Sequence, residues 1–593
     1  MSDMSMMRWD LQSVFPGDSN SPEITHFMEE TRKQLQFLEE GMKTDSLLHV
    51  IQKLQNCGAR LHEVGSYLSC LVSADVKDDK AKQLQTRLYE LDALYQKLLI
   101  QLDAHLLRLD ATQLETILKA PEMDEFRFWI NERARRAKDK LPAEMEDLAV
   151  QLGIDGYRSW GDLYNILVGR MSITLHKDGK TEQLSMGQAF NRMSSQNRQE
   201  RETIFQIWED TWAKEADLFQ PTLNHIAGYR LALYRARGWS SPLSEPLLIN
   251  RMSQETLEAM WDTVERNKPL LLEYLKEKAR LLGVDAPSWC DVDAPLGQME
   301  QRFSYQEARD LIVEQFSRFN PEMGKFASQC FEKRWIEAED RPGKRPGGFC
   351  TSFPISQETR IFMTFSGSAG NVSTLAHELG HAFHQHVMRG LPYYQTRYAM
   401  NVAETASTFA EAIVSDATMQ EASDPKQRLI LLADKVDRGV VMFMNIHARF
   451  LFETRFYEER KRGMLGVQDL NELMTQAQKD AFHNALSSYH PHFWASKLHF
   501  YITGTPFYNF PYTFGYLFST GIYARAKAEG LSFGNKYVTL LRDTGRMNVE
   551  NLAKQHLGVD LTQSDFWQEA ANAVMADAKT FLQESSAFSP SDL

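Results

Sequence analysis

The feature that most constrains the fold is a helical spacing of apolar residues over long stretches of the chain. Between residues 24 and 120 the apolar positions recur at steps of three and four, with few turn signals. The leucines that show this spacing are Leu84, Leu88, Leu91, Leu94 and Leu98. Such a pattern places apolar side chains on one face of an α-helix, and it resumes from Arg198 to about Ala338. We therefore expect a mainly α protein whose long helices pack as hairpins.

Short strand-like runs interrupt the helical pattern at two places. Asp178 and Gly179 separate two alternating runs, which is the usual signal for a two-residue β-hairpin. The densest cluster of proline and glycine lies at residues 341–348. Residues 349–353 and 361–365 follow it as short runs rich in aromatic and β-branched residues. The sequence therefore predicts small β-hairpins or a small sheet among the helices.

Composition excludes several classes of partner. The 66 Lys and Arg residues against 79 Asp and Glu give a net charge of −13, which argues against a phosphate-binding nucleic-acid surface. The longest apolar run, residues 439–446, is far short of the ~20 residues that a membrane-spanning helix needs. The first 20 residues lack a secretory signal, and the five cysteines form no C-x-x-C pair. We expect a soluble, cytoplasmic protein with reduced thiols, no membrane or nucleic-acid partner and no obligate protein partner.

The sequence His377-Glu378-Leu379-Gly380-His381 carries the clearest chemical signal. On a helix, two histidines four residues apart lie about 40° apart on one face, so both imidazoles can bind one zinc ion. Glu378 lies at the rim of that face, where its carboxylate can take a proton from an attacking water. We therefore predict a zinc site with Glu378 as the general base.

Glu404 is the expected third ligand, because a catalytic zinc ion takes three protein ligands. It lies 23 residues after His381, which leaves room for the first helix to end, for a loop and for a second helix to return. Small and apolar neighbours indicate a buried carboxylate, which needs a metal or a charged partner. A solvated helix charge is the alternative.

Two further residues share faces with the predicted ligands. Glu411 lies on the helical face of Glu404 and could accept the free N–H of a ligating imidazole. His384 lies on the face of His377 and His381 and is expected behind the ligands or facing substrate. A histidine packed in the core is the alternative for His384.

The segment 374–384, followed by the glutamates and serine of 404–411, resembles the M3 metallopeptidases and, within them, the oligoendopeptidase F group. Residues 9–11, 348–350 and 558–561 are also similar, so the resemblance covers nearly the whole chain. It implies a large helical ellipsoid with a deep substrate channel, gluzincin-type zinc-binding helices and a small β-hairpin or sheet next to the site. It also implies one Zn²⁺ per chain and cleavage of internal bonds in short oligopeptides.

The same resemblance implies a division of the chain into three segments. Residues 1–120 would form a helical scaffold or lid, and residues 121–195 a small connecting domain with a β-hairpin. Residues 196–593 would form the catalytic domain.

The resemblance also implies roles for residues beyond the zinc ligands. The strand 361–365, with Phe365 and Gly367 at its end, would pair with extended substrate by β-augmentation; a core hairpin is the alternative. His499, Tyr508 and Tyr512 would bind the oxyanion of the reaction, and Tyr516 would contact the substrate. Aromatic-rich segments such as these are usually core.

Two other functions remain open from the sequence. The first is a zinc exopeptidase of the dipeptidyl carboxypeptidase kind, which would need a pocket for a terminal carboxylate. The second is a catalytically inactive peptide-binding protein, against which the intact Glu378 argues.

Overall fold

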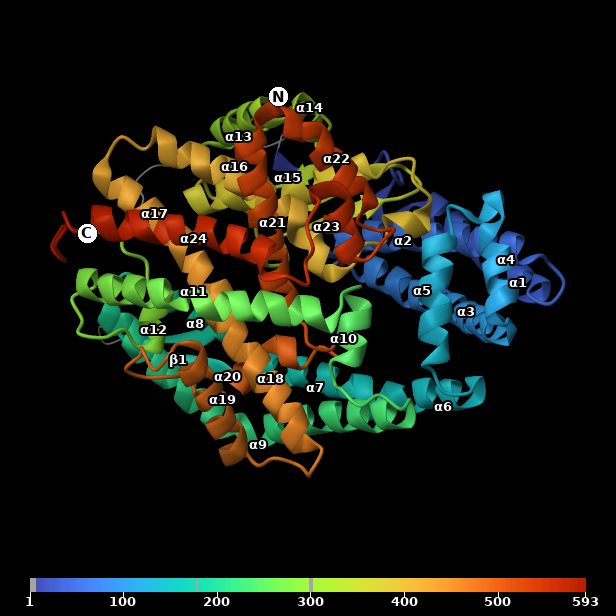
Figure 1. Cartoon of the computed structure of the whole chain (residues 1–593), viewed down its shortest axis with the longest axis horizontal. Coiled ribbons are helices and arrows are strands. Elements are labelled where there is room, and N and C mark those ends of the chain that lie inside the picture. The colour runs from blue at the N-terminus through green and yellow to red at the C-terminus, as the bar shows by residue number, and fades with distance from the viewer. Residues whose placement is uncertain (1–6, 178–179, 298–301, 593) are drawn as a thin grey trace. The chain divides into compact units, whose positions relative to one another are not determined.

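The computed structural model describes residues 7–177, 180–297 and 302–592, and most of these residues are helical (Figure 1). The chain divides into two compact units. Unit 1 comprises Met1–Ala143, Glu300–Thr418 and Ile522–Val559, and unit 2 comprises Glu144–Met299, Met419–Gly521 and Asp560–Leu593. The two sheets have three and two strands, so the prediction of a mainly α protein with small sheets is confirmed.

Unit 1 contains the N-terminal helices, a three-stranded sheet and the helices that follow it. Its helices are α1 (Pro22–Gly41), α2 (Leu47–Ala74), α3 (Asp79–Arg108), α4 (Ala111–Lys119), α5 (Arg127–Lys138), α13 (Tyr305–Phe319), α14 (Pro321–Glu332), α15 (Ala369–Val387), α22 (Phe533–Asp543), α23 (Val549–Leu557) and most of α16 (Met400–Glu421). Its strands are β3 (Ile336–Glu337), β4 (Phe349–Phe353) and β5 (Glu358–Phe362).

The N-terminal helices form the hairpins that the apolar spacing predicts. Helices α1 and α3 both pack on α2, and together they bury one continuous hydrophobic cluster. Leu84, Leu88, Leu91 and Leu98 are buried in this cluster, and Leu94 packs partly buried against it. The helical phase of these residues therefore sets which face of α3 points into the core.

The sheet of unit 1 has the order β3-β5-β4. Strand β5 pairs antiparallel with β4, so that Phe349 lies opposite Phe362, and parallel with β3, so that Ile336 lies opposite Ile361. Helices α2 and α15 both pack against β4 and β5. The sheet thus connects the N-terminal hairpins to α15, which carries the H-E-x-x-H sequence.

The strand boundaries correct two predictions. Strand β4 begins and ends where the sequence indicated, but β5 covers 358–362 rather than 361–365. Its start is set by the hairpin, because Glu358 lies directly opposite Phe353. The helical pattern expected to reach Ala338 ends with α14 at Glu332, and Ile336 and Glu337 pair with β5 as β3.

Unit 2 contains a second set of helices and the two-stranded sheet. Its elements are α6 (Ala143–Gly153), α7 (Ser159–Arg170), β1 (Ser172–Lys177), β2 (Lys180–Ser185), α8 (Met186–Arg192), α9 (Arg198–Ala236), α10 (Ser244–Ile249), α11 (Gln254–Leu281), α12 (Trp289–Val292), α17 (Pro425–Val440), α18 (Ile446–Arg460), α19 (Val467–Ala481), α20 (Phe493–Ser496), α24 (Ser564–Ser585) and most of α21 (Phe510–Glu529). Helix α24 packs against α11 and α17, and α18 packs against α19.

Strands β1 and β2 form the hairpin expected around Asp178 and Gly179, with Lys177 opposite Lys180. The two turn residues themselves lie outside the described residues. The three-segment division of the chain, the ellipsoidal shape and the substrate channel stay predictions. None of the described helices has the length and apolar character needed to cross a membrane.

Helices α15 and α16 approach each other at Gly380. A Cβ atom placed on Gly380 would lie 2.5 Å from the carbonyl oxygen of Ala406 and 2.7 Å from Cα of Ser407. Both distances are too short for a methyl group, so only glycine allows the two backbones to meet here. This contact sets the spacing between the helix of His377 and His381 and the helix of Glu404.

We expect Gly380→Ala to force α15 and α16 apart and to destabilise unit 1 by about 1–3 kcal/mol, the usual cost of overpacking. Gly370→Ala is the matched control, because Gly370 lies on the same helix and a Cβ there meets only the Ser368 hydroxyl at 3.8 Å. The control should be neutral or slightly stabilising, since alanine favours helix. Thermal unfolding of both variants tests this, and equal midpoints would contradict it.

Candidate metal centre

Helix α15 begins with a capping box that fixes the position of the H-E-x-x-H sequence. The Ser368 hydroxyl accepts a hydrogen bond from the Asn371 backbone N–H at 3.2 Å, and the Asn371 side chain accepts from the Ser368 backbone N–H at 3.4 Å. This arrangement satisfies N–H groups at the start of the helix. His377 and His381 follow on one face, with ring centroids 4.9 Å apart.

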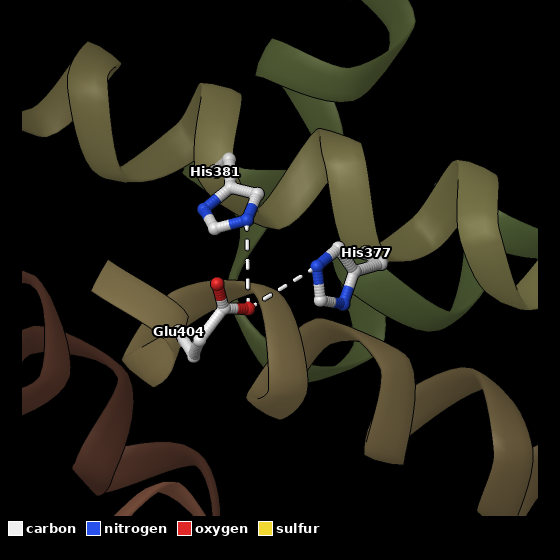
Figure 2. A group of neighbouring side chains, drawn as sticks. All are labelled: His377, His381 and Glu404. Carbon is white, nitrogen blue, oxygen red and sulfur yellow. Dashed lines mark ion pairs between the residues drawn. The ribbon is translucent and has the colours of Figure 1, made fainter. Parts of the chain in front are cut away.

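Three side chains from α15 and α16 converge at one point (Figure 2). Glu404 Oε2 lies 3.3 Å from His377 Nε2 and 3.7 Å from His381 Nε2. One ligand atom from each of the three residues lies within 4.8 Å of the others. The structure therefore brings together the three predicted metal ligands, and all three side chains are half-buried.

A second ring of hydrogen bonds holds these three residues in place. His377 Nδ1 lies 3.3 Å from Glu411 Oε2, and the Ser373 hydroxyl donates to Glu411 Oε1 at 3.0 Å. The Ser407 hydroxyl donates to Glu404 Oε2 at 3.0 Å. In the neutral tautomer that donates Nδ1–H to Glu411, Nε2 presents its lone pair to the point of convergence.

The electrostatics of the cluster suit a cation. Burial opposes charge on His377, but the carboxylates of Glu404 and Glu411 outweigh it and raise the pKa of the imidazole. Burial also opposes charge on Glu404, yet the two histidines hold the pKa of its carboxyl well below the usual range. Burial, with a smaller effect from His377, lowers the pKa of His381 to about 4, which keeps this imidazole neutral at pH 7.

Glu378 lies beside the cluster in a different environment. Its side chain is only 6% exposed, and among the described residues Oε2 has no hydrogen-bond partner. Burial raises the pKa of Glu378 to about 7, although His377 opposes the shift. A carboxyl whose pKa lies near neutral pH can both accept and return a proton. The backbone at Gly348 lies close to this carboxyl, because a Cβ atom added to Gly348 would lie 3.2 Å from Glu378 Oε1.

Comparison with known proteins identifies the family of the chain. Residues 191–573 match the family model described as Peptidase family M3. The chain belongs to peptidase family M3. A second model, described as Oligopeptidase F, matches residues 105–172.

Relatives extend the match over nearly the whole chain. The chain is 24% identical over 580 residues to the Group B oligopeptidase PepB of Streptococcus agalactiae, covering 95% of this chain and 94% of that protein. It is 23% identical over 591 residues to an oligoendopeptidase F homolog of Lactococcus lactis subsp. lactis, covering 95% of each.

Solved structures show the same fold. The fold is similar to that of oligoendopeptidase-F from Enterococcus faecium, with a TM-score of 0.69, 18% identity and coverage of 95% of this chain and 98% of that one. A crystal structure from Chlamydophila abortus aligns with a TM-score of 0.82, 20% identity and coverage of 99% of both chains.

Membership of family M3 confirms the resemblance drawn from the sequence and makes the chain a peptidase. Metallopeptidases of this family generally use zinc. Two imidazole nitrogens and one carboxylate oxygen are the donor set of many catalytic zinc sites. The residues of the cluster therefore fit the metal that the family implies.

His384 lies away from the ligand cluster. It is fully buried, its Nε2 lies 2.8 Å from the Thr544 hydroxyl, and its ring stacks on Tyr398 at 4.3 Å. Burial lowers the pKa of His384 to about 3. These contacts favour the packed histidine that the sequence left open, and a role behind the ligands stays a prediction.

Phe365 and Gly367, which were predicted to bind substrate, both make contacts that stabilise the fold. Phe365 is buried against Tyr305, with ring centroids 5.5 Å apart. Gly367 has φ of 86°, and its carbonyl accepts a hydrogen bond from the backbone N–H of Phe303 at 2.9 Å. Strand β5 is also central in its sheet: it pairs with β4 over 358–362 and with β3 over 361–362. The pairing of residues 361–365 with an extended substrate stays a prediction.

The aromatic residues predicted near the C-terminus gather within unit 2. The ring centroid of His499 lies 5.4 Å from that of Tyr508 and 5.9 Å from that of Tyr512. Burial, with smaller effects from Arg449 and Lys497, lowers the pKa of His499 to about 3. Tyr516 is half-buried on the same helix as Tyr512. Their contact with substrate stays a prediction.

Three features of the site were not found from the sequence. These are the Ser373 hydroxyl that donates to Glu411, the close approach at Gly380 and the approach of Gly348 to Glu378. The signal for Ser373 was available, because it lies four residues before His377 on the same helical face. Lys344, in the proline- and glycine-rich segment 341–348, is also almost buried and donates to the carbonyls of Glu339 and Met363.

We expect Glu411→Gln to weaken zinc binding by about 10- to 100-fold, because the His377 imidazole loses its carboxylate acceptor while the three ligands remain. Glu404→Gln, which replaces a ligand, should lose zinc far more completely. Competition with a chelator of known affinity measures both. Glu421→Gln is the control, since Glu421 is exposed near the end of the same helix. Unchanged affinity in Glu411→Gln would show that Glu411 does not support His377.

Proposed function

We propose that the chain is a zinc-dependent endopeptidase that hydrolyses internal bonds of short oligopeptides, with one zinc ion per chain held by His377, His381 and Glu404. The observation that carries the proposal is the convergence of these three side chains beside the buried carboxyl of Glu378. The names of its relatives, an oligopeptidase and an oligoendopeptidase F homolog, support the substrate class.

Zinc would supply Lewis acidity toward the scissile carbonyl and would lower the pKa of water at the site. Glu378 takes the proton of the attacking water on its carboxylate and later delivers it to the leaving amine. Its burial favours this role, since a pKa of about 7 suits both steps. Glu411 holds the Nδ1 proton of His377, so that the imidazole keeps one tautomer throughout.

His499, Tyr508 and Tyr512 are proposed as donors to the oxyanion that develops on the carbonyl. Their grouping supports this role, because three donors lie in one aromatic cluster of unit 2. The lowered pKa keeps His499 neutral at pH 7, and His499 Nδ1 is buried with no hydrogen-bond partner among the described residues.

The cytoplasm is the proposed compartment. All five cysteines are free and four of them are buried, which suits a reducing environment. The net charge of −13 supports peptides rather than nucleic acids as partners.

Replacing the proposed base tests the mechanism. We expect Glu378→Gln to keep its zinc but to lower kcat by about 10²- to 10⁴-fold, the usual contribution of general acid–base catalysis. Metal analysis and steady-state kinetics on zinc-saturated protein measure the two effects. Glu314→Gln is the control, because Glu314 is exposed on α13 and pairs only with Arg318 in the described ion pairs. Near-normal turnover in Glu378→Gln would remove Glu378 from the mechanism.

Peptides with both ends blocked test the reaction type. A mixture of end-capped peptides about ten residues long should be cut internally, as mass spectrometry would show, and a stably folded protein should stay intact. Chelation should abolish cleavage, and added zinc should restore it. An exopeptidase would spare the capped peptides and cut uncapped ones. No cleavage of either set by zinc-loaded protein would support a binding protein instead.

A further inference from the structure

Tyr508 lies near the end of a loop that is fixed by hydrogen bonds within unit 2. The loop covers residues 501–509 and connects the short helix η7 (Leu498–Phe500), which contains His499, to α21, which contains Tyr512. A hydroxyl is an effective oxyanion donor only if its position is set before the reaction. The contacts that hold this loop therefore bear directly on what Tyr508 can do.

Arg230 of α9 holds the first part of the loop. This buried side chain donates from Nη2 to the carbonyl of Ile502 at 2.7 Å and from Nε to the Tyr157 hydroxyl at 2.6 Å. The Tyr157 hydroxyl donates in turn to the carbonyl of Thr503 at 2.7 Å. Two neighbouring carbonyls of the loop are thus fixed to one buried guanidinium, directly or through Tyr157.

The residue before Tyr508 has an unusual backbone conformation. Phe507 has φ of 52°, in the left-handed region that bulky residues rarely adopt. Its backbone N–H donates to Glu453 Oε1 of α18 at 3.2 Å. Its ring is buried and contacts the ring of Tyr457 on the same helix, with centroids 5.2 Å apart. Such conformations persist only where the surrounding structure imposes them, and they cluster at functional sites.

The residue after Tyr508 is bound by the same helix. Arg449 Nη1 donates to Asn509 Oδ1 at 3.2 Å, while Arg449 Nε donates to Asn445 Oδ1 at 2.9 Å. Arg449 and Glu453 are four residues apart on α18, so they share one face of the helix. Both side chains are buried. One helical face therefore binds the residues on both sides of Tyr508.

Glu453 is a buried carboxyl with no part in the proposed proton transfers. Burial raises the pKa of Glu453 to about 7, although Arg230 and the Phe507 N–H oppose the shift. Burying a carboxyl costs free energy, and in this position its oxygen accepts from the backbone of Phe507. Because the carboxyl is partly protonated at pH 7, the uncharged amide of glutamine is a close replacement for it.

The Tyr508 hydroxyl itself is available to a ligand. It makes no hydrogen bond within the part of the chain that the structure describes, and its side chain is half-buried. The ring contacts those of His499 and Tyr512, with centroids 5.4 Å and 5.9 Å away. The loop thus fixes the backbone of Tyr508 while the hydroxyl keeps its capacity to donate.

We propose that Arg449 and Glu453 are positioning residues for the reaction, which hold the residues on both sides of Tyr508 so that its hydroxyl is fixed as a donor to the oxyanion. The inference rests on the proposed peptidase function. Arg449 and Glu453 act through Tyr508 and not on the substrate.

Kinetics of single and double variants test the inference. Tyr508→Phe removes the donor and should lower kcat by about 10²- to 10³-fold with little change in KM. Glu453→Leu removes the acceptor of the Phe507 N–H and should lower kcat by about 10- to 100-fold. The double variant should be no slower than Tyr508→Phe alone, because the position of a missing hydroxyl no longer matters. Losses that multiply would overturn the inference.

A conservative variant and a control separate positioning from general damage. Glu453→Gln should keep kcat within about threefold, because its amide oxygen can accept from the Phe507 N–H. Glu458→Leu is the matched control, since Glu458 is exposed on the same helix and pairs with Lys461. Arg449→Gln loses the bond to Asn509 and should lower kcat by about 10-fold, which gives a second variant if Glu453→Leu does not fold.

Fluorine NMR tests the positioning without turnover. Fluorotyrosine placed at position 508 should give one narrow resonance in the native chain and in Glu453→Gln, and a shifted or broadened one in Glu453→Leu and Arg449→Gln. Unchanged spectra in both of the last two variants would overturn the inference, even if no peptide is cut. If the native chain cuts capped peptides and these two variants keep its kcat, the inference is wrong although the peptidase function stands.

Discussion

The contact of α15 with α16 at Gly380 is the constraint on which the metal centre depends. Ala406 and Ala410 of α16 face this point, and their backbone and Cβ atoms leave no room for a side chain on Gly380. His377 therefore comes within 3.3 Å of both Glu404 and Glu411, and His381 within 3.7 Å of Glu404. The positions of the three ligands therefore depend on helix packing as well as on coordination chemistry, because a larger residue at position 380 would separate the two helices.

Charge distribution at the site follows from that packing. One imidazole lies between two carboxylates, whereas Glu378 is buried with one oxygen unpaired among the described residues. The first arrangement attracts a cation, and the second holds a carboxyl that changes protonation state easily. Two glutamates on neighbouring helices, Glu378 and Glu404, thus have opposite shifts in pKa, which is the pattern expected when one acts as an acid–base group and the other as a ligand.

Much of this site could be predicted because it depends on local rules. Helical periodicity alone places His377 and His381 on one face, and it places Glu411 on the face of Glu404. The sheet depends on distant pairings and was predicted less well. Ile336 forms a strand only because Ile361 lies beside it, and the sequence near Ile336 reads as helix. The burial of Lys344 likewise depends on carbonyls that the fold brings to it.

Strand β4 has different partners on its two faces. The Thr351 hydroxyl lies 2.8 Å from that of Ser66 on α2, whereas the neighbouring thiol of Cys350 faces Gln385 on α15. Because side chains alternate along a strand, insertion of a single residue before Cys350 would exchange these faces and break both contacts at once. Strand β4 therefore tolerates substitutions more readily than any change in its length, because an insertion or deletion reverses the faces of every residue beyond it.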